Sequence, residues 1–297
     1  AGSKLKFKGK EIEVENLENF DFSKAKITFF SAGGKISEKY VPLAAKHSVV
    51  IDNSSHFRMD PDVPLIVPQV NSNDLKNIKK NIIANPNCST IQLVVALKPI
   101  HDKFEIKRVI VSTYQAVSGA GKPAMDELFN QTKGVFVHDQ AKPEQFTKKI
   151  AFNVIPHIDV FMDDGSTKEE WKMRVETKKI LDPNINLVAH CVRVPVFIGH
   201  SEAVFVECKK EIDEKNVRNL LRESQGVTVI DHRADEGYVT PDEVAGEDDV
   251  YVSRIRKDPS VKNGIAFWCV GDNLRKGAAL NTVQIAELLC SKILKGK

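Results

Sequence analysis

Apolar runs and helical segments alternate in the first third of the chain. Residues 26–30 and 48–52 are short, mostly apolar runs, and residues 36–45 between them have the spacing of a helix. Two such strands joined by a helix through short links are typical of a βαβ unit, whose parallel strands are buried on both faces. A third apolar run at residues 81–84 ends before Pro86, because proline cannot extend a strand ladder. The pattern predicts an α/β fold with a parallel sheet.

Beyond residue 100 the expected strands are longer and alternate apolar with polar positions. They fall at residues 107–115, 187–196, 203–208, 227–230, 250–256 and 265–270. A closing helix is expected over residues 278–293, where an apolar stripe is formed by Leu280, Val283, Ile285, Leu288 and Leu289. Two further patterns predict an edge strand within residues 11–15 and a short strand and turn within residues 63–71. A chain of 297 residues is long enough for two such domains.

A helix start is expected at residue 166. Ser166 stands three residues before Glu169, which is the spacing of a capping box with Ser166 as the N-cap. Glu169 and Lys172 are then one turn apart on the same face of the helix. They are either a solvated surface pair or part of a binding site, and the sequence physics leaves both open.

Composition and charge exclude several classes of function. Hydrophobic residues make up 42% and charged residues 28%, with a formal net charge of +3 and no block of basic residues. Nothing therefore favours nucleic acid or a membrane surface as a partner. The five cysteines are odd in number and lack the CxxC spacing. This pattern fits neither a disulfide framework nor a zinc site, and it suggests a reducing compartment, with the cytoplasm as the expected location.

The strongest candidate for chemistry is the segment Asn85–Thr90, with the sequence NPNCST. It joins the apolar run at 81–84 to a helical pattern, and its Asn, Ser and Thr residues are good N-caps. Cys88 is therefore expected at the positive end of a helix, where free backbone N–H groups lower the pKa of a thiol and make it a nucleophile. The alternative is a buried structural cysteine, which is the commoner fate of a free thiol.

Other polar turns follow strands and carry weaker signals. Gly33 and Gly34 could hold a nucleotide phosphate or simply form a tight turn, and no GxGxxG motif occurs. Arg58 could bind an anion or pair with the acidic residues that follow it. The small-residue loop at 116–121 is either a corner or a place where a ligand approaches the backbone. His200, after a glycine at a strand break, could be a general base or a loop imidazole.

Six stretches in the same order resemble the aspartate-semialdehyde dehydrogenase family. They are DNSSHFR at 52–58, NPNCST at 85–90, TYQAVSGAG at 113–121, EEWK at 169–172, RVPVFIGHS at 193–201 and DNLRKGAAL at 272–280. The resemblance covers essentially the whole chain. It implies the reversible, NADP-dependent conversion of L-4-aspartyl phosphate to L-aspartate 4-semialdehyde, on the way to lysine, threonine and methionine.

The resemblance also implies a role for each matching residue. Cys88 is expected to be the nucleophile that forms a thioester, with His200 as acid/base and Gln115 orienting the substrate. The substrate is expected to contact Arg193 through its α-carboxylate, Glu169 through its α-amino group, and Asn87. Inorganic phosphate, the second substrate, is expected at Arg58 and Lys172. The residues expected to line the dinucleotide are Ser31, Gly34, Asn53, Ser118, Gly119 and Asn273. No metal is implied.

The implied architecture is an incomplete Rossmann-like domain plus an α+β catalytic and dimerisation domain. Residues 1–87 and 273–297 are expected to form the NADP-binding domain and residues 88–272 the catalytic one, in a homodimer. The family begins with a strand and a glycine-rich turn resembling GATGxVG, which wraps the pyrophosphate. Ala1 resembles a position after that unit, so we expect about forty residues of the family pattern to be missing before it.

Three rival interpretations compete with this one. Other phosphorylating aldehyde dehydrogenases have SCTTN or GCYPT around the thiol, and neither sequence is present. A catalytically impaired fragment with only an assembly role is favoured by the missing nucleotide turn and opposed by the intact Cys88 and His200. A Cys-His hydrolase would leave Arg58 and Lys172 without a role.

Overall fold

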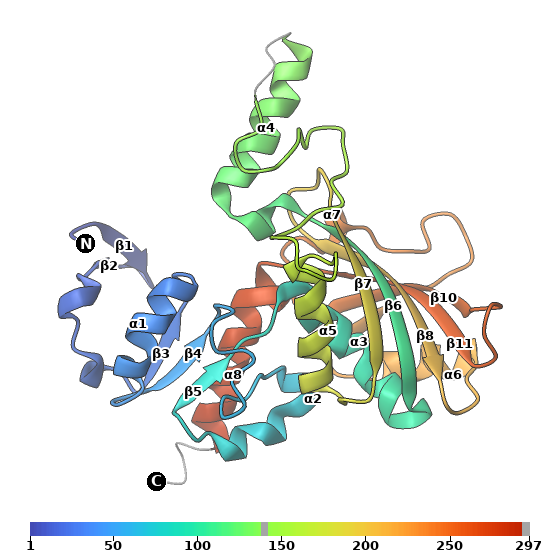
Figure 1. Cartoon of the computed structure of the whole chain (residues 1–297), viewed down its shortest axis with the longest axis horizontal. Coiled ribbons are helices and arrows are strands. Elements are labelled where there is room, and N and C mark those ends of the chain that lie inside the picture. Colours follow the sequence, from blue (N-terminus) through green and yellow to red (C-terminus); the bar gives the residue numbers. More distant parts are fainter. Residues whose placement is uncertain (138–141, 293–297) are drawn as a thin grey trace.

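A three-stranded parallel sheet forms the first part of the molecule. The computed structural model describes residues 1–137 and 142–292. The strands are β3 (Ile27–Phe30), β4 (Val49–Asp52) and β5 (Ile82–Ala84), in that order across the sheet, and α1 (Gly34–Ala44) connects the first two (Figure 1). The register pairs Phe30 with Asp52 and Asp52 with Ala84, so the strands end at one edge. The expected βαβ unit and the α/β class are confirmed.

A six-stranded mixed sheet forms the second part. Its order is β7 (Asn186–Arg193), β6 (Ile106–Gln115), β8 (His200–Cys208), β11 (Gly264–Gly271), β10 (Val250–Lys257) and β9 (Val227–Val229). One face packs in a common core with α3 (Cys88–Phe104), α5 (Lys168–Ile180) and α6 (Glu214–Arg222). Apolar side chains on other positions of these strands, such as Ile110, Tyr114 and Val188, are exposed.

The closing helix α8 (Leu280–Lys292) returns to the first sheet. Its Ile285 and Leu289 pack in one apolar cluster with Ile51 of β4 and Ile83 of β5. The helix begins two residues later than expected, residue 293 lies outside the described residues, and Val283 of the expected stripe is exposed. The C-terminal helix therefore packs against the three-stranded parallel sheet of the N-terminal part (Figure 1).

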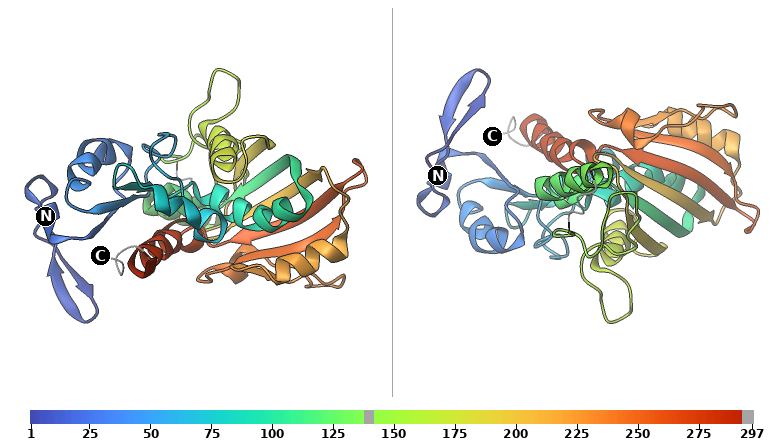
Figure 2. Two further views of the ribbon diagram at one scale, coloured as in Figure 1. Left: turned by 90° about the horizontal axis from the view of Figure 1, so that it is seen from below. Right: turned by 90° about the horizontal axis from the view of Figure 1, so that it is seen from above.

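Of two expectations for the N-terminal part, the edge strand is confirmed, and the strand within residues 63–71 is wrong. The predicted edge strand belongs to a separate hairpin of β1 (Lys4–Phe7) and β2 (Lys10–Glu13), closed at Lys8–Gly9 and exposed along its whole length; it projects from the body in both views of Figure 2. Within residues 63–71, Leu65 makes only a bridge to Ala84 and the segment continues as α2 (Pro68–Asn71). Proline favours the first turn of a helix, which explains this difference.

The remaining elements are short, apart from one helix. α4 (Lys122–Phe136) extends away from the body (Figure 1), and α7 (Pro241–Val244) is a single turn. Further short helical segments are η1 (Leu17–Asn19), η2 (Phe22–Lys24), η3 (Ser72–Asn77), η4 (Val117–Ala120) and the π-helical η5 (Arg275–Ala279). None of the described helices is long and apolar enough to cross a lipid bilayer.

Candidate active site

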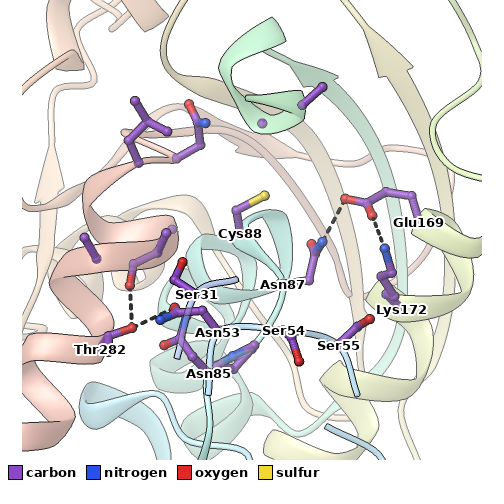
Figure 3. Close-up of a pocket in the computed structure, with 18 of the residues that line it drawn as sticks. Ser31, Asn53, Ser54, Ser55, Asn85, Asn87, Cys88, Glu169, Lys172 and Thr282 are labelled. Carbon is purple, nitrogen blue, oxygen red and sulfur yellow. Dashed lines mark hydrogen bonds and ion pairs between the residues drawn. The ribbon is translucent and has the colours of Figure 1, made fainter. Parts of the chain in front are cut away.

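A cavity of about 890 Å³ lies between the ends of the first sheet, the start of α3, α5 and the η5 turn. Of the fourteen residues that the sequence singled out, all but His200 line it, and Figure 3 shows several of them around Cys88. His200 is fully buried behind Cys88. Residues from seven separate stretches of the chain are therefore brought to one place.

The Asn85–Thr90 turn has the expected geometry. β5 ends at Ala84 and α3 begins at Cys88, with Asn87 as its N-cap. The Asn87 side-chain oxygen accepts hydrogen bonds from the backbone N–H groups of Ser89 and Thr90, at 3.0 and 3.2 Å. These bonds satisfy two of the free donors at the helix start and hold Cys88 in the first turn.

Cys88 and His200 are in direct contact. The Cys88 Sγ lies 3.3 Å from His200 Nε2, and the backbone N–H of Ala116 donates to His200 Nδ1 at 3.0 Å. Because Nδ1 accepts that bond, the proton of the neutral ring lies on Nε2, facing the sulfur. Burial and the nearby Arg193 lower the pKa of His200 to about 3, so the ring is neutral near pH 7.

The expected lowering of the Cys88 pKa is wrong for this structure. Burial, and then the charge of Glu169, raise the pKa of the thiol to about 12, and they outweigh Arg193 and Arg58, which act in the opposite direction. The start of a helix alone does not compensate for desolvation of the thiolate and a neighbouring carboxylate. The cysteine is nevertheless only partly buried, and it lines the cavity.

Glu169 is the centre of a buried hydrogen-bond network (Figure 3). Its Oε1 accepts from Asn87 Nδ2 at 2.8 Å and from Gln115 Nε2 at 3.1 Å, and its Oε2 accepts from Lys172 Nζ at 3.1 Å. The pKa of Glu169 stays below its usual value because Lys172 and these donors outweigh burial. The alternative of a solvated Glu169–Lys172 surface pair is therefore wrong.

The expected capping box is shifted by one residue. Thr167, not Ser166, is the N-cap of α5, and Glu170 reaches back to the Thr167 backbone N–H at 2.7 Å. Both registers fit the sequence pattern, but only this one turns Glu169 away from the helix start. Glu169 is thereby free to point into the cavity.

Arg58 is held by the protein on three sides. Its guanidinium donates to the carbonyl oxygens of Asn85 and Asn53, each at 2.9 Å, and forms an ion pair of 3.0 Å with Glu176. The alternative of a surface pair with the following acidic residues is wrong, since Asp60 pairs with Lys80. Glu176 was not singled out from the sequence, although it lies on the same helix as Glu169, seven residues later.

The remaining expected residues line other walls of the cavity. Arg193 is buried and donates to the Ala116 carbonyl at 2.7 Å. Asn273 donates to Ser118 Oγ at 2.9 Å and accepts from the Gly199 N–H at 2.9 Å. The sequence reasoning missed Thr282, which donates to Asn53 Oδ1 at 2.8 Å.

The η5 turn brings backbone against the cysteine. A Cβ atom on Gly277 would lie 2.9 Å from the Cys88 Cβ, too close for a real contact. Gly34, at the start of α1, instead has open space, with nothing within 4 Å of an added Cβ. A helix start with such space suits the approach of a phosphate group.

Comparisons with known proteins agree with this geometry. Two family models match, "Semialdehyde dehydrogenase, NAD binding domain" over residues 1–78 and "Semialdehyde dehydrogenase, dimerisation domain" over residues 97–276. An aspartate-semialdehyde dehydrogenase of Aquifex aeolicus is 56% identical over 97% of this chain and 86% of its own length. One from Rickettsia bellii is 48% identical over 99% of this chain and 87% of its own length.

Solved structures give the same result. The aspartate semialdehyde dehydrogenase II of Vibrio cholerae, in a complex with ASA, superposes with a TM-score of 0.96 and 50% identity, covering 98% of this chain and 87% of that one. The Candida albicans enzyme with NADP has a TM-score of 0.74 and 26% identity, covering 98% and 85% of the two chains.

Proposed function

The chain belongs to the aspartate-semialdehyde dehydrogenase family, and we propose here how its residues divide the reaction among them. It is an enzyme with aspartate-semialdehyde dehydrogenase activity and an NAD(P)-binding oxidoreductase of amino-acid biosynthesis. The reaction interconverts L-4-aspartyl phosphate and L-aspartate 4-semialdehyde, and we propose that its product serves lysine, threonine and methionine.

Cys88 is the proposed nucleophile. In the oxidative direction its sulfur bonds to the aldehyde carbon, and loss of hydride from that carbon leaves a thioester, which phosphate cleaves to release the acyl phosphate. His200 is the proposed acid/base group. As the sulfur adds, Nε2 gives its proton to the aldehyde oxygen and takes the thiol proton in exchange; that oxygen loses its proton to water as the hydride leaves, and Nε2 returns a proton to the sulfur when phosphate cleaves the thioester. The observation that carries the assignment is the 3.3 Å contact between Sγ and Nε2 at the wall of the cavity.

The charged ends of the substrate fit the charges around Cys88. Arg193 is proposed to bind the α-carboxylate, and Glu169 the α-ammonium group, with Asn87 and Gln115 orienting the chain between them. Because Glu169 is a cause of the raised Cys88 pKa, a bound ammonium group would offset that carboxylate and favour the thiolate. Phosphate is proposed to bind at Arg58 and Lys172.

NADP is the proposed cofactor, and it supplies or accepts the hydride. Ser31, Gly34 and Asn53 on one side of the cavity and Ser118, Gly119 and Asn273 on another are proposed to line it. The open space at Gly34 supports a phosphate there. The choice of NADP rests on the Candida albicans relative, whose structure is described with NADP.

The proposed domains follow the sequence expectation. Residues 1–87 and 273–297, of which 293–297 lie outside the described residues, are proposed as the cofactor domain, and residues 88–272 as the catalytic domain. The apolar cluster that joins α8 to β4 and β5 supports the first grouping.

A homodimer is proposed because exposed apolar residues such as Tyr114 and Val188 lie on strands of the region that matches a dimerisation model. A reactive thiol is preserved in a reducing compartment, so the cytoplasm is the proposed location.

The test is phosphate-dependent reduction of NADP by the full chain with L-aspartate semialdehyde. Wild-type protein should reduce NADP only when phosphate is present, and Cys88→Ala should abolish the reaction. Cys290→Ser, which changes an exposed cysteine outside the cavity, is the matched control and should retain it. Activity that survives in Cys88→Ala would refute the proposed mechanism.

A further inference from the structure

Lys172 lies between two carboxylates at the cavity wall. Its Nζ donates to Glu169 Oε2 at 3.1 Å, drawn in Figure 3, and to Asp159 Oδ2 at 2.7 Å. Burial opposes its charge, but the two carboxylates outweigh burial and keep the pKa of the ammonium above its usual value. A cation with two anionic neighbours is a poor receptor for a third anion unless one neighbour leaves.

Glu169 cannot move away from Lys172 without breaking other hydrogen bonds of the site. The same carboxylate accepts hydrogen bonds from Asn87, the residue before the nucleophile, and from Gln115. It is also almost completely buried. Moving it away from these donors would leave several buried polar groups without hydrogen-bond partners, which would destabilise the folded protein. Glu169 is therefore a fixed part of the wall.

Asp159 makes fewer hydrogen bonds than Glu169. Among the described residues, its side chain accepts only from Lys172 and from the N–H of its own neighbour Val160. It is partly exposed, with 31% of its side chain accessible, and it lies in the connection before α5 beside the exposed Val160 and Phe161. Its φ of 68° is in the left-handed region. Asp159 can leave Lys172 by a side-chain rotation into solvent.

We propose that Asp159 is an internal substitute for phosphate, holding Lys172 in the ligand-free enzyme and yielding it when a phosphate group enters. The proposal rests on the function proposed above, in which Lys172 binds phosphate. Asp159, Lys172 and Arg58 line the same cavity, so the exchange needs no opening of the fold. A dianionic phosphate competes with a single carboxylate better than a monoanion does, so the exchange also favours phosphate over monoanions.

The direct test is calorimetric titration of inorganic phosphate into the full chain at constant ionic strength. Asp159→Asn should bind phosphate about three- to tenfold more tightly than wild type, because the competing charge is gone. Asparagine tolerates the left-handed backbone, so the fold is kept. Asp164→Asn is the matched control: it removes the same charge from the same connection, but Asp164 contacts Ser166 and Arg174 and not Lys172. It should change the affinity less than twofold. Unchanged or weaker binding by Asp159→Asn would overturn the proposal.

A double-mutant comparison separates exchange at Lys172 from a general effect of charge. Lys172→Met should weaken phosphate binding, and adding Asp159→Asn in that background should restore nothing. If the double variant still binds more tightly than Lys172→Met alone, Asp159 acts through the field of the whole site and the exchange is wrong.

Turnover of the same variants distinguishes the failure of the two proposals. With a functioning enzyme, Asp159→Asn should lower the KM for phosphate by the same factor, whereas merely structural damage would not lower it. Normal turnover by wild type with an unchanged phosphate KM in Asp159→Asn refutes the exchange alone. The expected binding pattern without any phosphate-dependent NADP reduction by wild type refutes the proposed function alone.

Discussion

The backbone N–H of Asn87 donates to the Glu176 carboxylate at 2.7 Å, although 89 positions separate the two residues. The other oxygen of Glu176 pairs with Arg58. Glu169, two turns earlier on the same helix, holds the side chain of Asn87. The residue before the nucleophile is thus fixed from α5 at both its backbone and its side chain, and Arg58 is fixed by the same helix.

Glu176→Gln should lower the free energy of unfolding by about 3–5 kcal/mol, because it leaves the Arg58 charge buried without its partner. It should also change the rate at which Cys88 is alkylated, since the preceding residue loses a bond. Urea denaturation and iodoacetamide labelling measure the two effects. The matched control is Glu287→Gln on the exposed face of α8, expected to change stability by less than about 0.5 kcal/mol. Equal stabilities of the two variants would show that the ion pair contributes little.

Gly277→Ala should reduce turnover by about a hundredfold with little loss of overall stability. The added methyl group would lie 2.9 Å from the Cβ and 3.3 Å from the Cα of Cys88, so the nucleophile must shift. Displacements of about 1 Å in an active site cost rates of this size. Steady-state turnover measures the loss, and the rate of Cys88 alkylation reports the shift of the nucleophile. Gly34→Ala, with open space around its Cβ, is the control for the alkylation rate alone. Full turnover by Gly277→Ala would mean that the backbone of the η5 turn shifts and Cys88 keeps its position.

Features that depend on neighbouring residues could be predicted from the sequence, whereas the effects of charges from residues far along the chain could not. The Asn85–Thr90 turn follows from its own residues, because proline and the N-cap residues act within a few positions. The pKa of Cys88 does not, since it depends on burial and on Glu169, a residue far away in the chain. The capping register of α5 was ambiguous between Ser166 and Thr167 because each has a glutamate three residues later. Glu176 carried no local signal beyond its helix spacing.

The expected strands show the same limit. Buried strands such as β4 could be predicted because a strand that is buried on both faces has a nearly continuous run of apolar residues. The pattern at residues 11–15 also alternates, but both faces of β2 are exposed. Alternation predicts a strand and does not predict its partner, which here is β1 alone.

Glu169→Gln should increase the rate of Cys88 alkylation between pH 7 and 9. The carboxylate raises the pKa of the thiol, so its removal lowers that pKa and increases the thiolate fraction at a given pH. The rate of iodoacetamide labelling against pH, measured in a Cys290→Ser background that removes the exposed thiol, gives the shift. A rate profile that moves to higher pH would contradict the assigned direction.

Glu202→Gln should stabilise the protein increasingly as the pH rises above about 4.5. Burial raises the pKa of Glu202 well above its usual value and outweighs the nearby Gln92 side chain, which acts in the opposite direction. Neither carboxyl oxygen has a partner with good hydrogen-bond geometry among the described residues. The folded state therefore keeps a proton that the unfolded state releases above that usual value. By linkage, the stability that wild type has at low pH is lost between the unfolded and the folded pKa, at up to about 1.4 kcal/mol per pH unit. An amide cannot lose a proton, so the variant escapes this loss. Urea midpoints at pH 5, 7 and 9 should diverge between the two proteins, whereas parallel midpoints would mean that Glu202 is ionised in the folded state.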